Sequence, residues 1–166
     1  MDNTEFESPL AKKTILALRK KGYFASFAES CTGGLISKML TDVPGSSDVI
    51  AGGVVSYSNH VKEKVLGVSH DTLEKHGAVS EETALEMCTG VRDITDADVS
   101  VSVTGIAGPT GGSAEKPVGT VCFGIAHPKG AFALTEHFGA EHSRDAIRHM
   151  TAERAMKLII ETLQSL

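Results

Sequence analysis

The stretch Asp98–Thr104 has the sequence DVSVSVT, and residues 105–113 follow it as GIAGPTGGS. Valine alternates with polar residues in the first stretch, and this period of two predicts a β-strand. The second stretch is rich in glycine, which favours a loop with unusual backbone conformations. Open α/β sheets bind their ligands in loops at the ends of strands. This pair of segments therefore predicts an α/β protein with a site beside residues 104–113.

Helical and strand-like patterns alternate along the rest of the chain. Ser8-Pro9 and Gly22 are typical start and stop signals, and they predict a helix over residues 9–21. Further helices are expected over residues 35–40, 59–66 and 71–76, after Ser80 and after Ser143, and strands over 23–28, 52–57, 118–126 and 131–138. Strand 52–57 (GGVVSY) is expected to be buried. The order predicts a three-layer α/β/α sandwich with a mixed sheet, as a single domain over residues 1–166.

Charge and composition exclude several classes of protein. Lys and Arg number 16 against 21 Asp and Glu, and a formal net charge of −5 argues against a nucleic-acid partner. No apolar run is long enough to span a bilayer, and Met1–Leu10 is too acidic for a secretory signal. Three cysteines without CxxC spacing indicate a reducing compartment. We therefore expect a cytoplasmic protein with no membrane partner.

The segment AESCTGG over residues 28–34 is the first candidate site. It joins a strand to a helix, so Ser30 could act as a nucleophile beside backbone N–H groups of the same turn that hold an oxyanion. Cys31 is a rival nucleophile, because a helix N-terminus lowers the pKa of a thiol. A simpler interpretation is that Ser30 or Thr32 only caps the helix and that Cys31 is a small buried side chain.

The segment SYSNHVK over residues 56–62 is the second candidate. Ser58 or Asn59 would cap a helix and bring Lys62 into its first turn, where the helix dipole disfavours a cation. Burial would lower the pKa of Lys62 further and allow it to act as a general base, with Tyr57 relaying the proton. The alternative is a solvated surface lysine and an aromatic at the edge of the core.

The third candidate is the glycine-rich loop, residues 104–113, whose backbone N–H groups could bind a phosphate. It has neither a Walker A lysine nor the GxGxxG pattern, and a plain turn is the alternative. Arg144 and Arg148, one turn apart on the last helix, could bind an anion or form a solvated face. No histidine pair has HExxH spacing, so neither a metal nor a cofactor is expected.

Taken together, these segments resemble the CinA C-terminal domain family, the nicotinamide-nucleotide amidohydrolases. The matching stretches are AESCTGG (28–34), GGVVSYSNHVK (52–62), HGAVSEETA (76–84) and VSVTGIAGPTGGSAEKPVGTVCFGI (101–125). The resemblance implies an α/β/α fold, a homo-oligomer, and hydrolysis of nicotinamide mononucleotide to nicotinate mononucleotide and ammonia. Because the chain begins at the amidase region, we expect the stand-alone form. A non-catalytic nucleotide-binding or interaction module linked to competence or DNA damage is the alternative.

The family motifs also imply roles for individual residues. Ser30 would be the nucleophile, Lys62 its activating base and Tyr57 the proton-relay or positioning hydroxyl. The substrate would meet the oxyanion turn and, by the chemistry of the loop rather than by the family motif, a phosphate site. The residues expected there are Thr32, Gly33, Gly34, Gly105, Ala107, Gly108, Gly111, Gly112 and Arg144.

Overall fold

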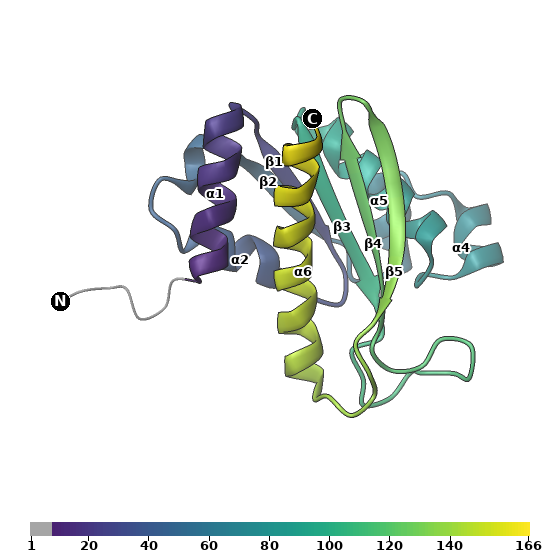
Figure 1. Ribbon diagram of the computed structural model, residues 1–166. Helices are drawn as coiled ribbons and strands as arrows, with labels where there is room; N and C mark the ends of the chain where they lie inside the picture. Colours follow the sequence, from purple (N-terminus) through teal and green to yellow (C-terminus); the bar gives the residue numbers. More distant parts are fainter. Residues whose placement is uncertain (1–7) are drawn as a thin grey trace.

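Five strands form one mixed sheet in the computed structural model, which describes residues 8–166 (Figure 1). Their order is β2-β1-β3-β4-β5, with β1 (Ala25–Glu29), β2 (Ile50–Val55), β3 (Val99–Gly105), β4 (Thr120–His127) and β5 (Gly130–His137). Strand β1 is parallel to both β2 and β3, whereas β3, β4 and β5 are antiparallel to their neighbours. The prediction that Met1–Leu10 is not a secretory signal rests mainly on residues 1–7, which lie outside the described residues.

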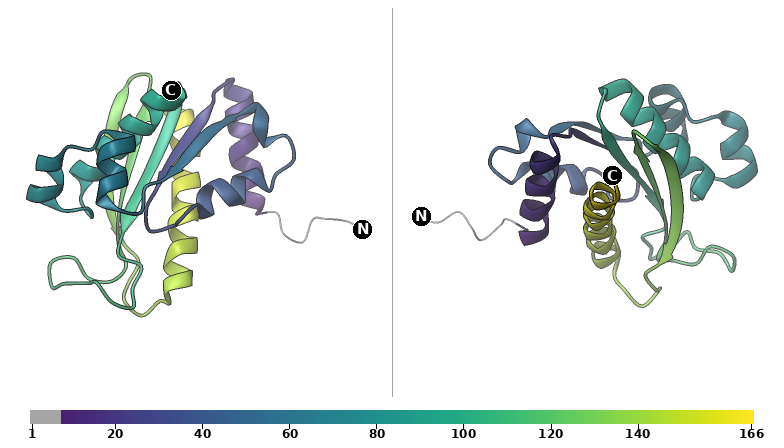
Figure 2. Two further views of the ribbon diagram at one scale, coloured as in Figure 1. Left: turned by 180° about the vertical axis from the view of Figure 1, so that it is seen from behind. Right: turned by 45° about the horizontal axis from the view of Figure 1, so that its top comes forward.

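Helices cover both faces of this sheet (Figures 1 and 2). One layer contains α1 (Pro9–Lys21), α2 (Leu35–Thr41) and the long α6 (Arg144–Ser165), which contact one another. The other layer contains α3 (Asn59–Leu66), α4 (His70–His76) and α5 (Glu81–Thr95), with α5 packed along β3 and β4. A short 3-10 helix, η2 (Ser46–Asp48), precedes β2. The predicted three-layer sandwich with a mixed sheet is confirmed.

Local capping explains why the helix boundaries were predictable. The Ser8 side chain accepts a hydrogen bond from the Ala11 N–H at the start of α1, and Gly22 ends that helix with φ +71°. The Ser143 hydroxyl accepts from the Ala146 N–H at the start of α6 in the same way. Each such cap contributes about 1 kcal/mol to the stability of a helix. The predicted helices after Ser8 and Ser143 are confirmed at these ends.

Burial in two of the strands follows from their positions in the sheet. In β3 the valines and the serines are both buried, because helices cover the two faces. Ser100 and Ser102 face α5, where their hydroxyls donate to main-chain carbonyls of that helix. Strand β2 was expected to be buried over 52–57, but it spans Ile50–Val55 at the edge of the sheet, where every second residue is exposed. Tyr57 therefore lies beyond the end of the strand.

The larger core lies between the sheet and the layer of α1, α2 and α6. Phe27 and Phe123 of the sheet pack there with Ile147 and Ile159 of α6, all fully buried. Burying one such side chain contributes about 1.5–3 kcal/mol relative to leaving it exposed. This core fixes β1 and β3 against α6, whose N-terminal end lies near the carboxyl ends of the two strands (Figure 1). In residues 8–166 no helix is long and apolar enough to cross a membrane.

Candidate active site

The candidate site lies where the parallel strands β2, β1 and β3 end side by side. Ser30 directly follows β1, and its N–H donates to the Val103 carbonyl of β3 at 3.0 Å. On the other side, the Ser56 N–H donates to the Glu29 carbonyl at 2.8 Å, which continues the pairing with β2. A cavity of about 220 Å³ opens at this point. Its lining residues are Ser30, Cys31, Tyr57, Asn59, Lys62, Ala78, Val79, Thr104, Gly105, Ala107 and Arg144.

Lys62 is buried at the floor of the site, with 1% of its surface exposed. Its Nζ lies 3.0 Å from Ser30 Oγ and donates to the main-chain carbonyls of Ser56 at 2.7 Å and Tyr57 at 3.4 Å. Helix α3, capped by the Ser58 hydroxyl, carries the lysine in its first turn as predicted. Burial lowers the pKa of Lys62 from 10.5 to about 8. A solvated surface lysine, the alternative interpretation, is therefore wrong.

The two candidate nucleophiles have very different environments. Ser30 contacts Lys62 through its hydroxyl, whereas the Cys31 thiol is buried and has no hydrogen bond to a cation among the described residues. Burial raises the pKa of the Cys31 thiol to about 12, so it stays protonated. The lowered pKa expected from a helix N-terminus is wrong here, because desolvation outweighs the dipole. The alternative in which Ser30 or Thr32 caps α2 is also wrong: Gly34 holds that position, with no side-chain cap.

Residues 30–34, called the nucleophile turn from here on, are held by Glu29. Its buried carboxylate accepts hydrogen bonds from the Thr32 hydroxyl at 2.6 Å and the Gly34 N–H at 3.0 Å. The Gly33 N–H donates to the Ser30 carbonyl. The expected oxyanion donors at Gly33 and Gly34 are therefore already engaged, which corrects that part of the prediction. Within residues 8–166, the Cys31 and Thr32 N–H groups of the turn donate to no other residue.

The glycines of the nucleophile turn lie directly before α2. Gly33 and Gly34 have φ values of +60° and +100°, a region that side chains with a Cβ rarely adopt. Arg148 holds the other polar side of the turn, since its guanidinium donates to the carbonyls of Cys31 at 3.3 Å and Thr32 at 2.8 Å. The interpretation of Arg148 as part of a solvated face is therefore wrong. Thr32, Gly33 and Gly34 do not line the cavity.

Arg144 and Tyr57 meet at the mouth of the cavity. The Arg144 guanidinium donates to the Gly108 carbonyl at 2.8 Å and to the Tyr57 hydroxyl at 3.0 Å. Tyr57 is 62% exposed. Its hydroxyl accepts from Arg144, whereas its main-chain carbonyl accepts from Lys62. Across the described residues, no carboxylate forms an ion pair with Arg144. The mouth therefore carries a cation whose charge is not neutralised by a neighbouring acid.

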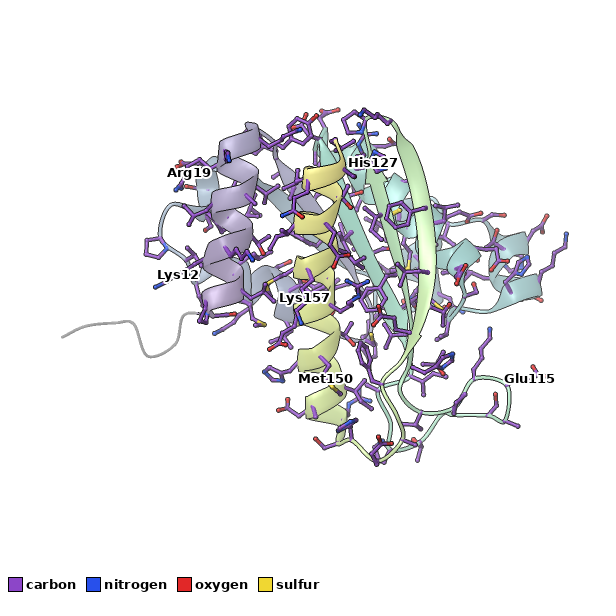
Figure 3. All side chains as sticks on the ribbon, in the orientation of Figure 1. Lys12, Arg19, Glu115, His127, Met150 and Lys157 are labelled. Atoms are coloured by element: carbon purple, nitrogen blue, oxygen red, sulfur yellow. The ribbon has the colours of Figure 1, made fainter. Side chains whose placement is uncertain are left out.

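The glycine-rich loop divides into two parts. Gly105 and Ala107 line the cavity, and a Cβ on Gly105 would lie 2.9 Å from the Thr120 carbonyl, so close packing requires glycine there. Gly108 is buried but does not line the cavity, and its carbonyl accepts from Arg144. Gly111 and Gly112 are exposed and lie outside the cavity, which corrects their expected place in the site. They belong to the segment that carries Glu115 away from the sheet (Figure 3).

Sequence reasoning missed several residues of the site. Asn59, Ala78, Val79 and Thr104 line the cavity, and although each lies in one of the matching stretches, none was expected to border the substrate. Glu29 was quoted within AESCTGG but assigned no role. An acidic residue at the end of a buried strand, directly before the nucleophile, is the signal that could have found it. Among residues 8–166 there is no group of three His, Cys, Asp or Glu side chains that could hold a metal ion.

Both the sequence and the fold have matches among known proteins. The family model for the CinA C-terminal domain matches residues 7–163. The chain belongs to the CinA C-terminal domain family. A crystal structure of competence/damage inducible protein CihA from Agrobacterium tumefaciens superposes with a TM-score of 0.89 and 43% identity, covering 93% of each chain. A CinA superfamily protein from Klebsiella pneumoniae superposes with a TM-score of 0.90 at 32% identity, covering 95% of this chain and 97% of that one.

Relatives in the family differ in length. A putative competence-damage inducible protein of Caldanaerobacter subterraneus subsp. tengcongensis is 46% identical over 99% of this chain, which spans 38% of that relative. The chain likewise spans 35% of a CinA-like protein from Fervidobacterium nodosum, at 47% identity over 89% of this chain. By contrast, a nicotinamide-nucleotide amidohydrolase PncC from Enterobacter agglomerans is 54% identical over 82% of each chain. The family thus includes both long and short proteins.

Proposed function

We propose that this protein hydrolyses the carboxamide of nicotinamide mononucleotide, giving nicotinate mononucleotide and ammonia. The observation that carries the proposal is the buried Lys62 amine 3.0 Å from the Ser30 hydroxyl, at the ends of three parallel strands. A serine and a lysine in hydrogen-bond contact form a nucleophile with its general base. The substrate class follows from the name of the PncC relative, which matches most of this chain.

The contacts of Lys62 support its role as the base. Two N–H groups of the amine are directed to the carbonyls of Ser56 and Tyr57. When the amine is neutral, its lone pair is then left for the Ser30 hydroxyl, which donates its proton to Nζ as Oγ attacks the carboxamide carbon. Because burial lowers the pKa of Lys62 to about 8, a useful fraction of the amine is neutral near pH 7–8.

The remaining steps balance without a metal or cofactor. The carboxamide oxygen becomes an oxyanion, for which we assign the Cys31 N–H, since Cys31 lines the cavity and this N–H donates to no other described residue. The protonated Lys62 returns its proton to the leaving nitrogen, and ammonia departs from an ester on Ser30. Water then attacks the ester and loses a proton to Lys62, which returns this proton to Ser30 Oγ as the ester bond breaks and the carboxylic acid is released.

Arg144 is the residue we assign to the substrate's phosphate. Its guanidinium lies at the mouth of the cavity without an acidic partner in residues 8–166, and guanidinium groups bind phosphate in a bidentate manner. Gly105 and Ala107 would border the ribose, between the carboxamide at Ser30 and the phosphate at Arg144. The Tyr57 hydroxyl contacts Arg144, which favours positioning over proton relay for that side chain.

The test is an ammonia-release assay with nicotinamide mononucleotide and with free nicotinamide, with no metal added. The wild-type protein should prefer the mononucleotide, and Ser30→Ala and Lys62→Ala should each abolish turnover. Lys64→Ala is the matched control, because Lys64 is an exposed lysine of the same helix and should keep full activity.

Two outcomes would contradict the proposal. Loss of activity in Cys31→Ala with full turnover in Ser30→Ala would move the nucleophile to Cys31. Stabilisation by the mononucleotide without any turnover would favour the non-catalytic nucleotide-binding module instead. The cytoplasmic location and the homo-oligomer stay predictions, and light scattering on the purified protein tests the second.

A further inference from the structure

We propose that Glu29 is a positioning residue for the Ser30 nucleophile and that it acts through the backbone of the nucleophile turn. The inference rests on the proposed function to the extent that it takes Ser30 as the reacting group. It concerns a residue that touches neither the cavity nor the hydroxyl of Ser30.

The carboxylate of Glu29 is 1% exposed and has no ion-pair partner among residues 8–166. Five hydrogen bonds offset the cost of burying this carboxylate, two of them from the nucleophile turn and three from the first turn of α2. The donors are Thr32 Oγ1 at 2.6 Å, Gly34 N at 3.0 Å, Ile36 N at 3.1 Å, Ser37 N at 2.8 Å and Ser37 Oγ at 2.7 Å. Hydrogen bonds to a charged acceptor are roughly twice as strong as neutral ones. The turn and the helix are therefore held to one buried point.

Glu29 also connects the two halves of the reacting pair. Its side chain holds the turn that starts with Ser30, and its own carbonyl accepts from the Ser56 N–H at 2.8 Å. The Ser56 carbonyl in turn accepts from Lys62 Nζ at 2.7 Å. The distance from Ser30 Oγ to Lys62 Nζ is thus set by segments that meet at this one residue. A shift of about 1 Å between reacting groups can lower a rate about 100-fold.

Arg148 completes the support from the opposite side of the turn. Glu29 takes the Gly34 N–H and the Thr32 hydroxyl, while Arg148 donates to the carbonyls of Cys31 and Thr32. The turn is therefore held at its donors by an anion and at its acceptors by a cation. The same arrangement occupies the N-terminal N–H groups of α2, so this helix end offers no free site to a substrate anion.

The experiment compares Glu29→Gln with Glu86→Gln. Glutamine keeps the shape of the side chain but directs an NH₂ group toward N–H donors, which should loosen the nucleophile turn. We expect kcat for nicotinamide mononucleotide to fall at least tenfold, with KM changed less than twofold. Glu86 is a matched control: it accepts from the Ser69 N–H at 2.7 Å and the Thr72 hydroxyl at 2.6 Å at the start of α4, away from the cavity. Glu86→Gln should lower the melting temperature and leave kcat unchanged.

A second readout does not depend on the substrate. The rate at which a fluorophosphonate probe labels Ser30 should fall at least tenfold in Glu29→Gln and stay at the wild-type value in Glu86→Gln. A wild-type protein that is labelled at Ser30 but releases no ammonia would overturn the proposed substrate and leave the role of Glu29 standing. Wild-type kcat and labelling rate in folded Glu29→Gln would overturn the role itself.

Should Glu29→Gln fail to fold, Thr32→Val provides the same test with a smaller change. It removes the 2.6 Å hydrogen bond to the carboxylate and keeps the shape and the buried charge. We expect about a threefold loss in both kcat and labelling rate. Rates equal to those of the wild-type protein would show that the turn keeps its geometry without this contact, against the proposal.

Discussion

The nucleophile turn and the glycine-rich loop look alike in sequence, since both follow a strand and both contain adjacent glycines. In the structure they differ. The turn is held by a buried carboxylate on one side and a guanidinium on the other, whereas the loop contributes Gly105 and Ala107 to the cavity and then continues into exposed residues. Glycine content thus reports backbone conformation and close packing. Buried polar contacts report where the chain holds reacting groups in place.

The largest effect expected from this comparison is that of Lys62→Met. The substitution keeps the apolar stem and removes the base beside the nucleophile turn, so kcat should fall at least about 1,000-fold. The pKa of Lys62 is lowered in the folded protein, so its buried charge costs stability below pH 8, and this cost decreases between about pH 8 and 10.5. At pH 7 the free energy of unfolding of Lys62→Met should therefore exceed that of the wild-type protein by about 1–3 kcal/mol. Chemical denaturation of both proteins at pH 7 and pH 10 measures this difference, and a variant less stable than the wild-type protein at pH 7 would contradict the argument.

The two arginines of α6 allow the nucleophile turn and the glycine-rich loop to be tested separately. Arg148 contacts the nucleophile turn and Arg144 contacts the loop at Gly108. Because each arginine makes charge-assisted hydrogen bonds, we expect its replacement to change kcat or KM by about 10- to 100-fold. Arg148→Met should lower kcat with little change in KM, and Arg144→Met should raise KM for the mononucleotide but not for free nicotinamide. Steady-state kinetics on both substrates checks this, each variant being the control for the other, and identical profiles would remove the distinction.

The pH dependence of the reaction should follow the titration of the buried Lys62 amine rather than that of charged groups near the loop. With a pKa of about 8 for Lys62, the neutral fraction rises from about a tenth at pH 7 to about nine tenths at pH 9. We expect kcat/KM to rise about tenfold over this range. Measuring the profile of Lys116→Ala, which removes a partly exposed charged group just beyond the loop, provides the control and should give the same midpoint. A midpoint near pH 6 would exclude Lys62 as the base.

The smallest effect is expected for Gly111→Ala in the exposed part of the loop. Gly111 has φ +90°, so alanine should lower the free energy of unfolding by about 1 kcal/mol through local strain. Because Gly111 lies outside the cavity, kcat and KM should change less than twofold. Thermal unfolding and steady-state kinetics measure both quantities. A tenfold rise in KM for the mononucleotide would restore the loop as the phosphate site.

Most elements of the fold could be predicted because their signals are local. Serine caps, terminating glycines and period-two valines act over a few residues, and α1, α3 and α6 begin at the residues that these signals indicate. The error in β2 has a tertiary cause: an apolar run cannot reveal that its strand lies at the edge of the sheet. Likewise, the alternation in β3 could not reveal that its serines bind carbonyls of α5.

The reacting residues of the site could be predicted from the sequence, but the contacts that hold them in place could not. A serine beside glycines and a lysine in a capped helix turn follow from residue types and spacing, and they are enough to identify Ser30 and Lys62 as candidates. Only the parallel register of β2, β1 and β3 decides that the two side chains meet, across 32 residues of chain, at 3.0 Å. Only folding decides that Glu29 uses up the N–H groups of Gly34 and α2, and that burial keeps Cys31 a thiol. Hydrogen bonds and burial between distant segments determine those outcomes, and no local pattern encodes them.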